Sequence, residues 1–312
     1  MLGGWVKLSD SPPVPRETGS AGLAGFSAAD PSDGDGAHGR VREVIEAGTS
    51  LSRLSHPVGT MRARLSFDRV ATVYDDTRGL PPKVLARTLG LLTDELHGKR
   101  VLDVGVGTGR YGLPLQKSGI RLVGADISRR MVEIGVAKGL RDVVLADGAH
   151  LPFAAKSFDV AATMHLLHLV PDWREILQEI VRVTQESFFT IIERTDATWG
   201  VKREYDDLVR QAGHSWKAPG IHERDLPDLL RPDMVLPVGP FHEVVSADGI
   251  LAELSRRDYS SQWEVPEDVH RKAMGTLRER WSGREIPREF TIEIPFWRVE
   301  RLLELAAAPQ TP

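Results

Sequence analysis

The sequence contains no cysteine among its 312 residues. Disulfide bonds and thiolate metal sites are therefore excluded, as is any mechanism with a cysteine nucleophile, and we predict no bound metal. No apolar run is long enough to span a bilayer, and the N-terminus lacks the basic start and apolar core of a signal peptide. These absences favour a cytoplasmic protein without a membrane span.

Neither sign of charge is in large excess, because 40 basic and 44 acidic residues leave a formal net charge of −4. This balance gives no general electrostatic attraction to nucleic acid or to an anionic membrane. The densest basic stretches, Arg256-Arg257 and Arg278–Arg284, are short enough to be solvated helix faces. We therefore expect a small-molecule partner rather than a nucleic acid. No feature of the sequence specifies an oligomeric state.

Large apolar residues are scarce in residues 1–60, where glycine, serine and proline are frequent. Such a segment offers little apolar surface to offset the entropy cost of ordering it, so we predict a disordered N-terminal extension. Residues 61–195 are expected to form a cofactor-binding core. Residues 196–312 would complete the same domain with substrate-covering elements and the last strands.

From Met61 onward helical and strand patterns alternate, which is typical of a parallel sheet with helices on both faces. Helices are predicted at Pro82–Leu96, Arg110–Lys117, Met131–Lys138 and Trp173–Val181, and after Glu193 at Lys202–Ala212 and Val265–Trp281. Strands are predicted at Arg100–Val104, Leu122–Ala125, Val143–Ala146, Phe158–Thr163, Phe188–Ile192, His242–Val245 and Glu289–Pro295. The fold class is therefore α/β, with a doubly wound sheet.

The most informative stretch is residues 101–109, which read VLDVGVGTG. A buried strand runs into a loop with glycine at every second position, and a helix follows. Glycine permits a tight turn and a close approach of a ligand to the backbone, beside the free N–H groups of the helix N-terminus. Asp126 ends the second strand, where a carboxylate can bind the two hydroxyls of a ribose. A nicotinamide cofactor is disfavoured, because Arg110 stands where its motif has a third glycine.

This combination resembles the class I methyltransferases that use S-adenosylmethionine, in particular the ubiquinone and menaquinone type (methyltransferase type 11). The resemblance runs from Phe67 to Glu193 and includes LADGAHLPF at 145–153 and SFDV at 157–160. It implies a Rossmann-like fold with a seven-stranded sheet, in which one strand, Glu289–Pro295, runs antiparallel beside the fifth. It also implies S-adenosylmethionine as the cofactor.

Carried over residue by residue, the resemblance assigns most of a cofactor site. Gly105, Gly107 and Gly109 would line the methionine part, with Asp103 orienting its amino group. Asp126 would hold the ribose, and Asp147 would accept from the adenine amino group beside the Gly148 backbone. Tyr74 would cover the cofactor from the opening helix. The implied cofactor-binding residues are Tyr74, Asp103, Gly105, Gly107, Gly109, Asp126, Ile127, Asp147, Gly148 and Met164.

The sequence departs from the family pattern at two places. After the fourth strand, Leu169 replaces the second of two adjacent histidines, and His165 stands where a small polar residue is common. His165 and His168 are candidate catalytic bases for an acceptor hydroxyl or amine, although packing alone also explains each of them. Before the fifth strand, residues 184–187 replace a proline-glycine turn, which implies a different turn there.

The function predicted from these features is methyl transfer to an O, N or C atom of a small molecule. The alternatives are a methyltransferase that acts on tRNA or another macromolecule, and a non-catalytic protein that binds S-adenosylmethionine. The C-terminal part is rich in aromatic residues, which suit a planar or lipid-like acceptor. We therefore predict that at least one of Trp199, Trp216 and Trp263 faces the acceptor cavity, with His165 across from it.

Overall fold

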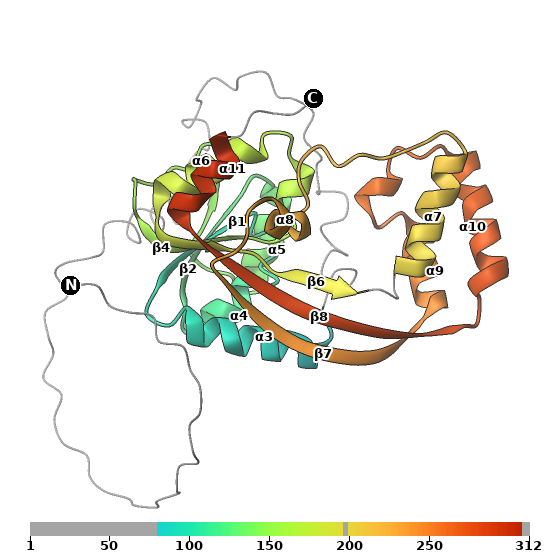
Figure 1. Ribbon diagram of the computed structural model, residues 1–312, viewed down its shortest axis with the longest axis horizontal. Helices are drawn as coiled ribbons and strands as arrows, with labels where there is room; N and C mark the ends of the chain where they lie inside the picture. The colour runs from blue at the N-terminus through green and yellow to red at the C-terminus, as the bar shows by residue number, and fades with distance from the viewer. Residues whose placement is uncertain (1–79, 196–198, 308–312) are drawn as a thin grey trace, which may run out of the picture. The chain divides into compact units, whose positions relative to one another are not determined.

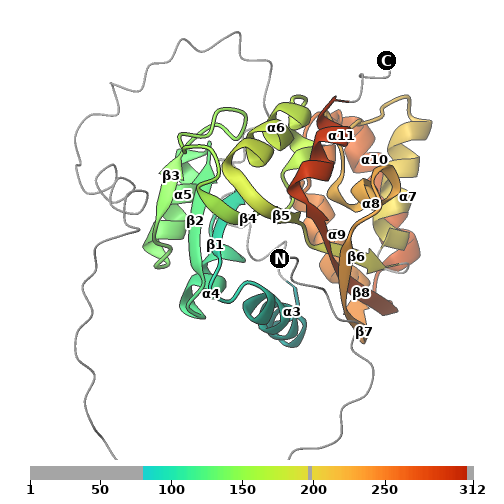
Figure 2. The same ribbon diagram turned by 60° about the vertical axis from the view of Figure 1, so that its left-hand side comes forward.

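The computed structural model describes residues 80–195 and 199–307, shown as coloured ribbon in Figure 1. The predicted N-terminal extension, residues 1–60, lies outside the described residues, and so does Tyr74. The fold is α/β, with a central sheet between helices (Figures 1 and 2). The first four strands of this sheet are the predicted ones to within one residue at either end.

The sheet contains eight strands among the described residues, in the path order β3-β2-β1-β4-β5-β8-β6, with β7 also paired to β8. The strands β1 to β5 are mutually parallel, whereas β8 is antiparallel to β5, β6 and β7. Their bounds are β1 Arg100–Val104, β2 Arg121–Asp126, β3 Val143–Leu145, β4 Phe158–Thr163, β5 Thr184–Phe189, β6 Ile192–Thr195, β7 Met234–Ser246 and β8 Glu285–Arg298.

The two short strands β5 and β6 are two parts of one interrupted strand. Phe189 pairs with Phe296 and Ile192 pairs with Glu293, so both parts keep one register along β8. Phe296 and Glu293 also pair with β7, which therefore occupies the opposite edge of β8. The interruption faces Pro295, which has no N–H to donate. The sheet is thus seven strands wide, and the predicted single antiparallel strand beside the fifth is confirmed.

Side chains alternate between the two faces of the sheet, as the pleat requires. Val101, Leu122 and Val160 belong to one buried cluster, whereas their neighbours Leu102 and Val123 belong to another. Helices α3 and α4 cover the first face, and α6 and α11 cover the second (Figures 1 and 2). The helices are α3 Pro82–Glu95, α4 Gly112–Lys117, α5 Arg129–Ala137, α6 Trp173–Val183, α7 Trp199–Gln211, α8 Leu226–Leu229, α9 Ala247–Arg256, α10 Glu267–Trp281 and α11 Leu302–Ala307.

One boundary expected from the sequence is wrong. Helix α6 ends at Val183, and β5 begins at the next residue, Thr184, so residues 184–187 form the start of the strand rather than a turn. The predicted strand Phe188–Ile192 began too late because Gln185 and Glu186 are polar and exposed, which hides the strand pattern at this end of the sheet. This difference lies at the amino end of β5, away from the glycine loop at the carboxyl edge of the sheet.

A third buried cluster lies beyond the main sheet, among α7, α9 and α10 and the outer ends of β7 and β8 (Figure 1). Its centre is Tyr205, whose hydroxyl lies 2.8 Å from Nδ1 of His270. Helix α7 overlaps the predicted helix Lys202–Ala212 but begins earlier, at Trp199, and α10 matches its prediction closely, but α9 was missed. Its sequence, ADGILAELSR, carries a glycine in the first turn, which lowers the helical signal.

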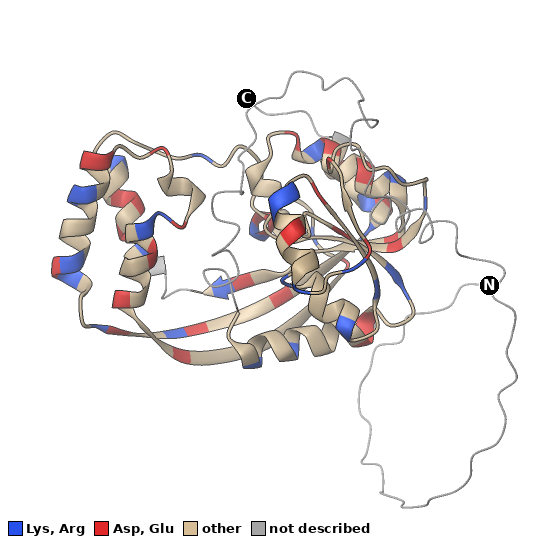
Figure 3. Cartoon of the chain, turned by 180° about the vertical axis from the view of Figure 1, so that it is seen from behind, with Lys and Arg blue, Asp and Glu red and all other residues tan. Residues whose placement is uncertain are grey.

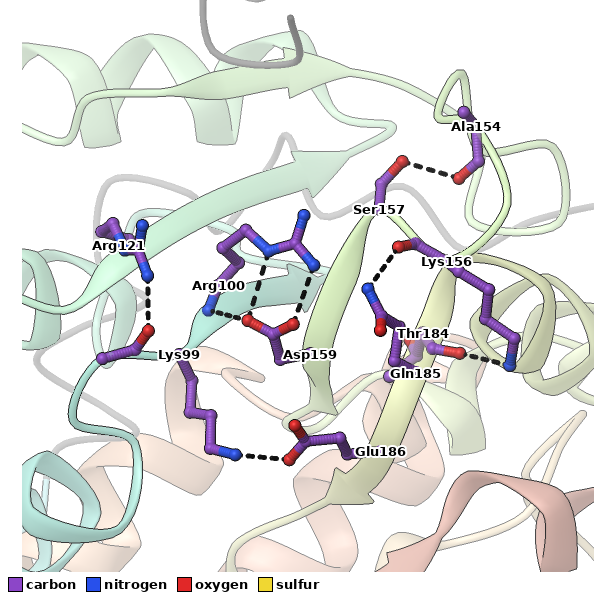
Figure 4. A network of polar contacts seen from close by, with 11 residues as sticks. Lys99, Arg100, Arg121, Ala154, Lys156, Ser157, Asp159, Thr184, Gln185 and Glu186 are labelled. Carbon is purple, nitrogen blue, oxygen red and sulfur yellow. Dashed lines mark hydrogen bonds and ion pairs between the residues drawn. The ribbon is translucent and has the colours of Figure 1, made fainter. Parts of the chain in front are cut away.

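The amino ends of the parallel strands are held together by ion pairs at the edge opposite the functional loops (Figure 4). Arg100 on β1 donates to both carboxylate oxygens of Asp159 on β4, with Nη2 to Oδ1 at 2.8 Å. The Arg100 guanidinium lowers the pKa of Asp159. Lys99 pairs with Glu186 at the start of β5. These contacts fix the register of adjacent strands and serve the fold.

Candidate functional site

The glycine loop after β1 has the backbone geometry that its sequence predicts. Gly105, Gly107 and Gly109 have φ angles of +82°, +56° and +78°, in the left-handed region that favours glycine. A Cβ atom added to any of them would come within about 3.2 Å of a neighbouring side chain. The loop therefore depends on glycine both for its conformation and for the space that its surroundings leave.

The carboxylate of Asp126 ties the end of β2 to this glycine loop. Its Oδ2 accepts from the backbone N–H of Gly107 at 2.8 Å, and its Oδ1 accepts from the N–H of Ser128 at 2.8 Å. Ser128 in turn caps α5 by accepting from the N–H of Met131 at 3.1 Å. The carboxylate of Asp126 thus holds the glycine loop and the start of α5 together at the end of β2.

Asp103, the last residue but one of β1, is buried beneath the same loop. Asp103 is only 2% exposed, and its Oδ1 atom has no hydrogen-bond partner among the described residues. Burial, with a smaller contribution from the charge of Asp126, raises the pKa of Asp103 to about 8. A buried carboxyl group with an unsatisfied oxygen fits a cationic ligand group, which would favour its ionised form.

The other predicted cofactor residues follow the neighbouring strands. Ile127 comes directly after β2 and is 56% exposed, whereas Met164 comes directly after β4 and is buried. Asp147 and Gly148 lie in the loop after β3, where Asp147 Oδ1 accepts from the N–H of Ala149 at 3.0 Å. Since β1 to β4 are parallel, all these residues lie at the carboxyl edge of the sheet, where ligands of open α/β sheets bind.

The two candidate histidines after β4 have different surroundings. His165 is exposed and adopts φ +61°, an uncommon conformation for a residue other than glycine. His168 is half-buried, and its Nδ1 lies 3.2 Å from Oε2 of Glu223. The imidazole of His168 also stacks on that of His222, with ring centroids 4.9 Å apart.

Glu223 is a functional candidate that the sequence reasoning missed. Its buried carboxylate accepts from the backbone N–H groups of Leu166 and Leu167 at 2.5 and 2.8 Å, besides its contact with His168. It therefore holds the segment that begins at the strained His165. No local pattern could have revealed this, because Glu223 and His168 are 55 residues apart in the sequence.

The electrostatics of this cluster favour an ionised glutamate. Burial alone would raise the pKa of Glu223, but the hydrogen bond and charge of His168 and the backbone N–H of Leu167 outweigh it and lower the pKa to about 2. Burial and the neighbouring His168 lower the pKa of His222 to about 4. At neutral pH the cluster thus holds a charged carboxylate and an uncharged His222.

A cavity of about 1250 Å³ lies between β6, α7 and the paired strands β7 and β8. Most of the side chains that line it are ionisable, including Glu193, Arg203, Asp206, Glu243 and Arg288. Trp216 and Trp263 do not line it, and Trp263 donates its indole N–H to the carbonyl of Arg257. The side chain of Trp199 lies outside the described residues.

Residues 102–190 match a family model described as methyltransferase domain. This part of the chain is therefore similar to a methyltransferase domain. The match begins in β1 and ends just after β5, so it covers the glycine loop, Asp126, Asp147 and both candidate histidines. The resemblance to the ubiquinone and menaquinone type of methyltransferase is confirmed by this match and by the relatives below.

Relatives of known name share this domain. A demethylmenaquinone methyltransferase of Paenarthrobacter aurescens is 32% identical over 141 residues, which are 44% of this chain and 54% of the relative. The biotin biosynthesis bifunctional protein BioHC of Cellvibrio japonicus is 30% identical over 132 residues, 42% of this chain and 26% of the relative. Among solved structures, the YcgJ protein of Bacillus subtilis is similar with a TM-score of 0.43 and 17% identity, over 68% of this chain and 99% of that one.

The chain spans about half or less of the length of these curated relatives. The family match ends at residue 190, just after β5, and the residues that line the cavity lie beyond it. Separately, none of the helices in the described parts of the chain has the length and apolar character needed to cross a membrane.

Proposed function

We propose that this protein transfers a methyl group from S-adenosylmethionine to an O, N or C atom of a small molecule. The observation that carries the proposal is the joined geometry of the glycine loop and Asp126, in which Gly107 donates to Asp126 Oδ2 at 2.8 Å. The match of residues 102–190 to the methyltransferase domain supports it. In this proposal residues 61–195 form the cofactor-binding core, and residues 196–312 complete the same domain.

The residues present fit the cofactor in charge as well as in shape. The positive φ angles of Gly105, Gly107 and Gly109 leave the loop backbone open to a ligand. Asp103 would orient the amino group of the methionine part, which satisfies its unpartnered buried oxygen. Asp126 would hold the ribose, with Ile127 beside it, and Asp147 and Gly148 would contact the adenine.

When bound, the cofactor supplies a methyl group on a sulfonium, together with its own leaving group. The chain's residues then have two tasks, which are to align the acceptor with the methyl group and to exclude water. Met164 and His165, directly after β4, lie at the carboxyl edge of the sheet, where both tasks are performed. A base is needed only where the acceptor must lose a proton.

His168 is the better placed of the two candidate bases. The carboxylate of Glu223 lies on its Nδ1 side at 3.2 Å, an arrangement that fixes the tautomer and leaves Nε2 as the acceptor of a proton. His165 acts on the same carboxylate through its charge. We assign proton removal to His168, and His165 stays a second candidate base.

Two measurements test this function. Titration calorimetry should show binding of S-adenosylmethionine and of its demethylated product, with NAD as the negative control. Transfer of radiolabel from the methyl group to small molecules should then separate an enzyme from a protein that only binds the cofactor. Preferential binding of NAD would overturn the proposal, and labelling confined to RNA or protein would favour a macromolecular acceptor.

A further inference from the structure

The cavity between β6, α7, β7 and β8 is built for a ligand unlike the one that the aromatic content suggested. We propose that it is the acceptor site and that it takes an amphoteric small molecule, one that carries both an amine and an anionic group such as a carboxylate or a phosphate. This inference rests on the proposed methyl transfer and names the class of its acceptor.

The first step concerns the position of the cavity relative to the cofactor loop. Strand β6 continues β5 beyond the carboxyl edge of the sheet and contributes Glu193 to the cavity wall. Arg224, which also lines the cavity, directly follows Glu223, whose carboxylate accepts from the backbone N–H groups of Leu166 and Leu167 after β4. The cavity therefore adjoins the loop after β4, at the edge of the sheet where the methyl donor would bind.

The second step concerns the strand wall, whose charges are already paired within the protein. Arg288 on β8 pairs with Glu193 on β6 and, at 3.1 Å, with Glu243 on β7. Its guanidinium also lies over the ring of Phe290, at 4.2 Å from the centroid. Burial raises the pKa of Glu193, and the charge of Arg288 opposes this rise. This wall is rigid and nearly balanced in charge.

The third step concerns the helix wall, where two charged side chains have no ion pair of their own. Arg203 and Asp206 on α7 both line the cavity, and neither side chain makes a hydrogen bond or an ion pair within the described part of the chain, whereas Arg210 on the same wall pairs with Asp207. Asp206 is half-buried; burial raises its pKa, and the charges of Lys202 and Arg210 oppose this rise. Residues three apart share one face of a helix, so both groups present themselves to the same ligand. A cationic amine suits Asp206, and an anionic group suits Arg203.

The lining also argues against an apolar acceptor. Figure 3 shows acidic and basic residues along α7 and α10 and along the β7 and β8 ribbon. Among the cavity residues only Val244, Pro287 and Phe290 are apolar, and Phe290 is covered by Arg288. An isoprenoid or other lipid-like chain would have to desolvate these charges without pairing them, which is costly. A hydrophilic acceptor replaces their water contacts with direct ones.

The test is a methyl-transfer assay with radiolabelled S-adenosylmethionine and a defined library. The library holds amino acids and aminophosphates, the matched amines and acids that carry one of the two charges, and neutral phenols and quinols. We expect label in amphoteric compounds. Asp206→Asn and Arg203→Gln should each raise the KM for that acceptor at least about tenfold, the size of one lost charge-assisted hydrogen bond, with unchanged cofactor affinity.

Matched controls use exposed residues outside the cavity, Asp94→Asn on α3 and Lys272→Gln on α10, which should leave the KM unchanged. Label confined to neutral or singly charged compounds would overturn the inference, as would an absence of label in a protein that binds the cofactor. A KM that rises equally in the control variants would overturn it too. Failure to bind S-adenosylmethionine is a different result, because it removes the proposed function itself.

Discussion

The half of the protein from β1 to β5 and the half from α7 to β8 differ in how their functional residues are encoded. In the first half each residue that contacts the cofactor in our proposal lies at the end of a strand, within a short legible motif. In the second half the cavity draws Glu193, Asp206 and Arg288 from β6, α7 and β8. The proposed cofactor site can therefore be recognised from short sequence motifs, whereas the proposed acceptor site exists only in the folded protein.

Glu223 joins the two halves. It precedes α8, in the second half, yet its carboxylate holds the backbone of Leu166 and Leu167 in the first. A carboxylate that accepts two backbone N–H groups and faces an imidazole keeps the loop after β4 in one conformation, including the positive φ of His165. We infer that this contact couples the two halves. The first variant below removes it.

Replacing Glu223 by alanine should have the largest effect on stability. The change leaves His168 and two buried N–H groups without their partner, and breaking a buried pair of this kind costs about 3–5 kcal/mol. Urea unfolding followed by circular dichroism measures it. Because the pKa of Glu223 is lowered, its contribution is present above the unfolded pKa of about 4.5 and is lost as the pH falls toward 2.

The matched control is the neighbouring Asp225→Asn, which removes an exposed carboxylate 3.7 Å from Arg224. An exposed pair contributes about 0–1 kcal/mol, so little change is expected. A loss of stability as small in Glu223→Ala as in this control would show that the two halves are not coupled through Glu223.

Replacing Asp126 by alanine should weaken binding of S-adenosylmethionine by about 1–3 kcal/mol, the cost of leaving buried polar groups without partners. The effect should be strongest in the cofactor half, because Asp126 accepts from the backbone N–H groups of Gly107 and Ser128, which both lie there. Calorimetry with Asp94→Asn as the control measures it. Unchanged affinity would remove Asp126 from the cofactor site.

The same division explains what could be predicted from the sequence. Strands β1 and β4 match the prediction to the residue, because buried strands and glycine turns leave local patterns. The antiparallel direction of β8 was implied by the family resemblance, and only its middle part, Glu289–Pro295, was predicted as a strand. The contact of Trp199, Trp216 or Trp263 with the acceptor stays a prediction, whereas Tyr205 is buried in the core of the α7, α9 and α10 cluster. Composition shows which residues are present, but long-range packing decides which of them face a cavity.

Two glycines with similar φ angles can distinguish the backbone strain of an alanine substitution from its steric clash with neighbouring side chains. Gly105 and Gly119 have φ angles of +82° and +87°, but an added Cβ would meet Leu166 at 3.1 Å at the first and nothing within 4 Å at the second. Alanine at either position should cost about 1–2 kcal/mol of stability, because a Cβ disfavours this region. Only Gly105→Ala should also weaken cofactor binding, since it displaces the segment that Glu223 holds. Equal cofactor affinity in both variants would contradict the proposed role of the loop.

The smallest expected effect is the release of one proton when the cofactor binds. It tests whether the buried carboxyl group of Asp103 faces a cationic group of the cofactor. With a pKa raised to about 8, Asp103 is mostly protonated at pH 7 in the free protein. The native state then holds one more proton than the unfolded chain between about pH 4 and 8, so stability should fall as the pH rises across this range, by at most about 1.4 kcal/mol per pH unit.

Binding of a cation beside Asp103 favours the ionised carboxylate and should release close to one proton at pH 7. Calorimetry in two buffers with different enthalpies of ionisation measures the release. In Asp103→Asn both the proton release and this pH dependence should vanish, whereas a release that persists in that variant would assign the proton to another group.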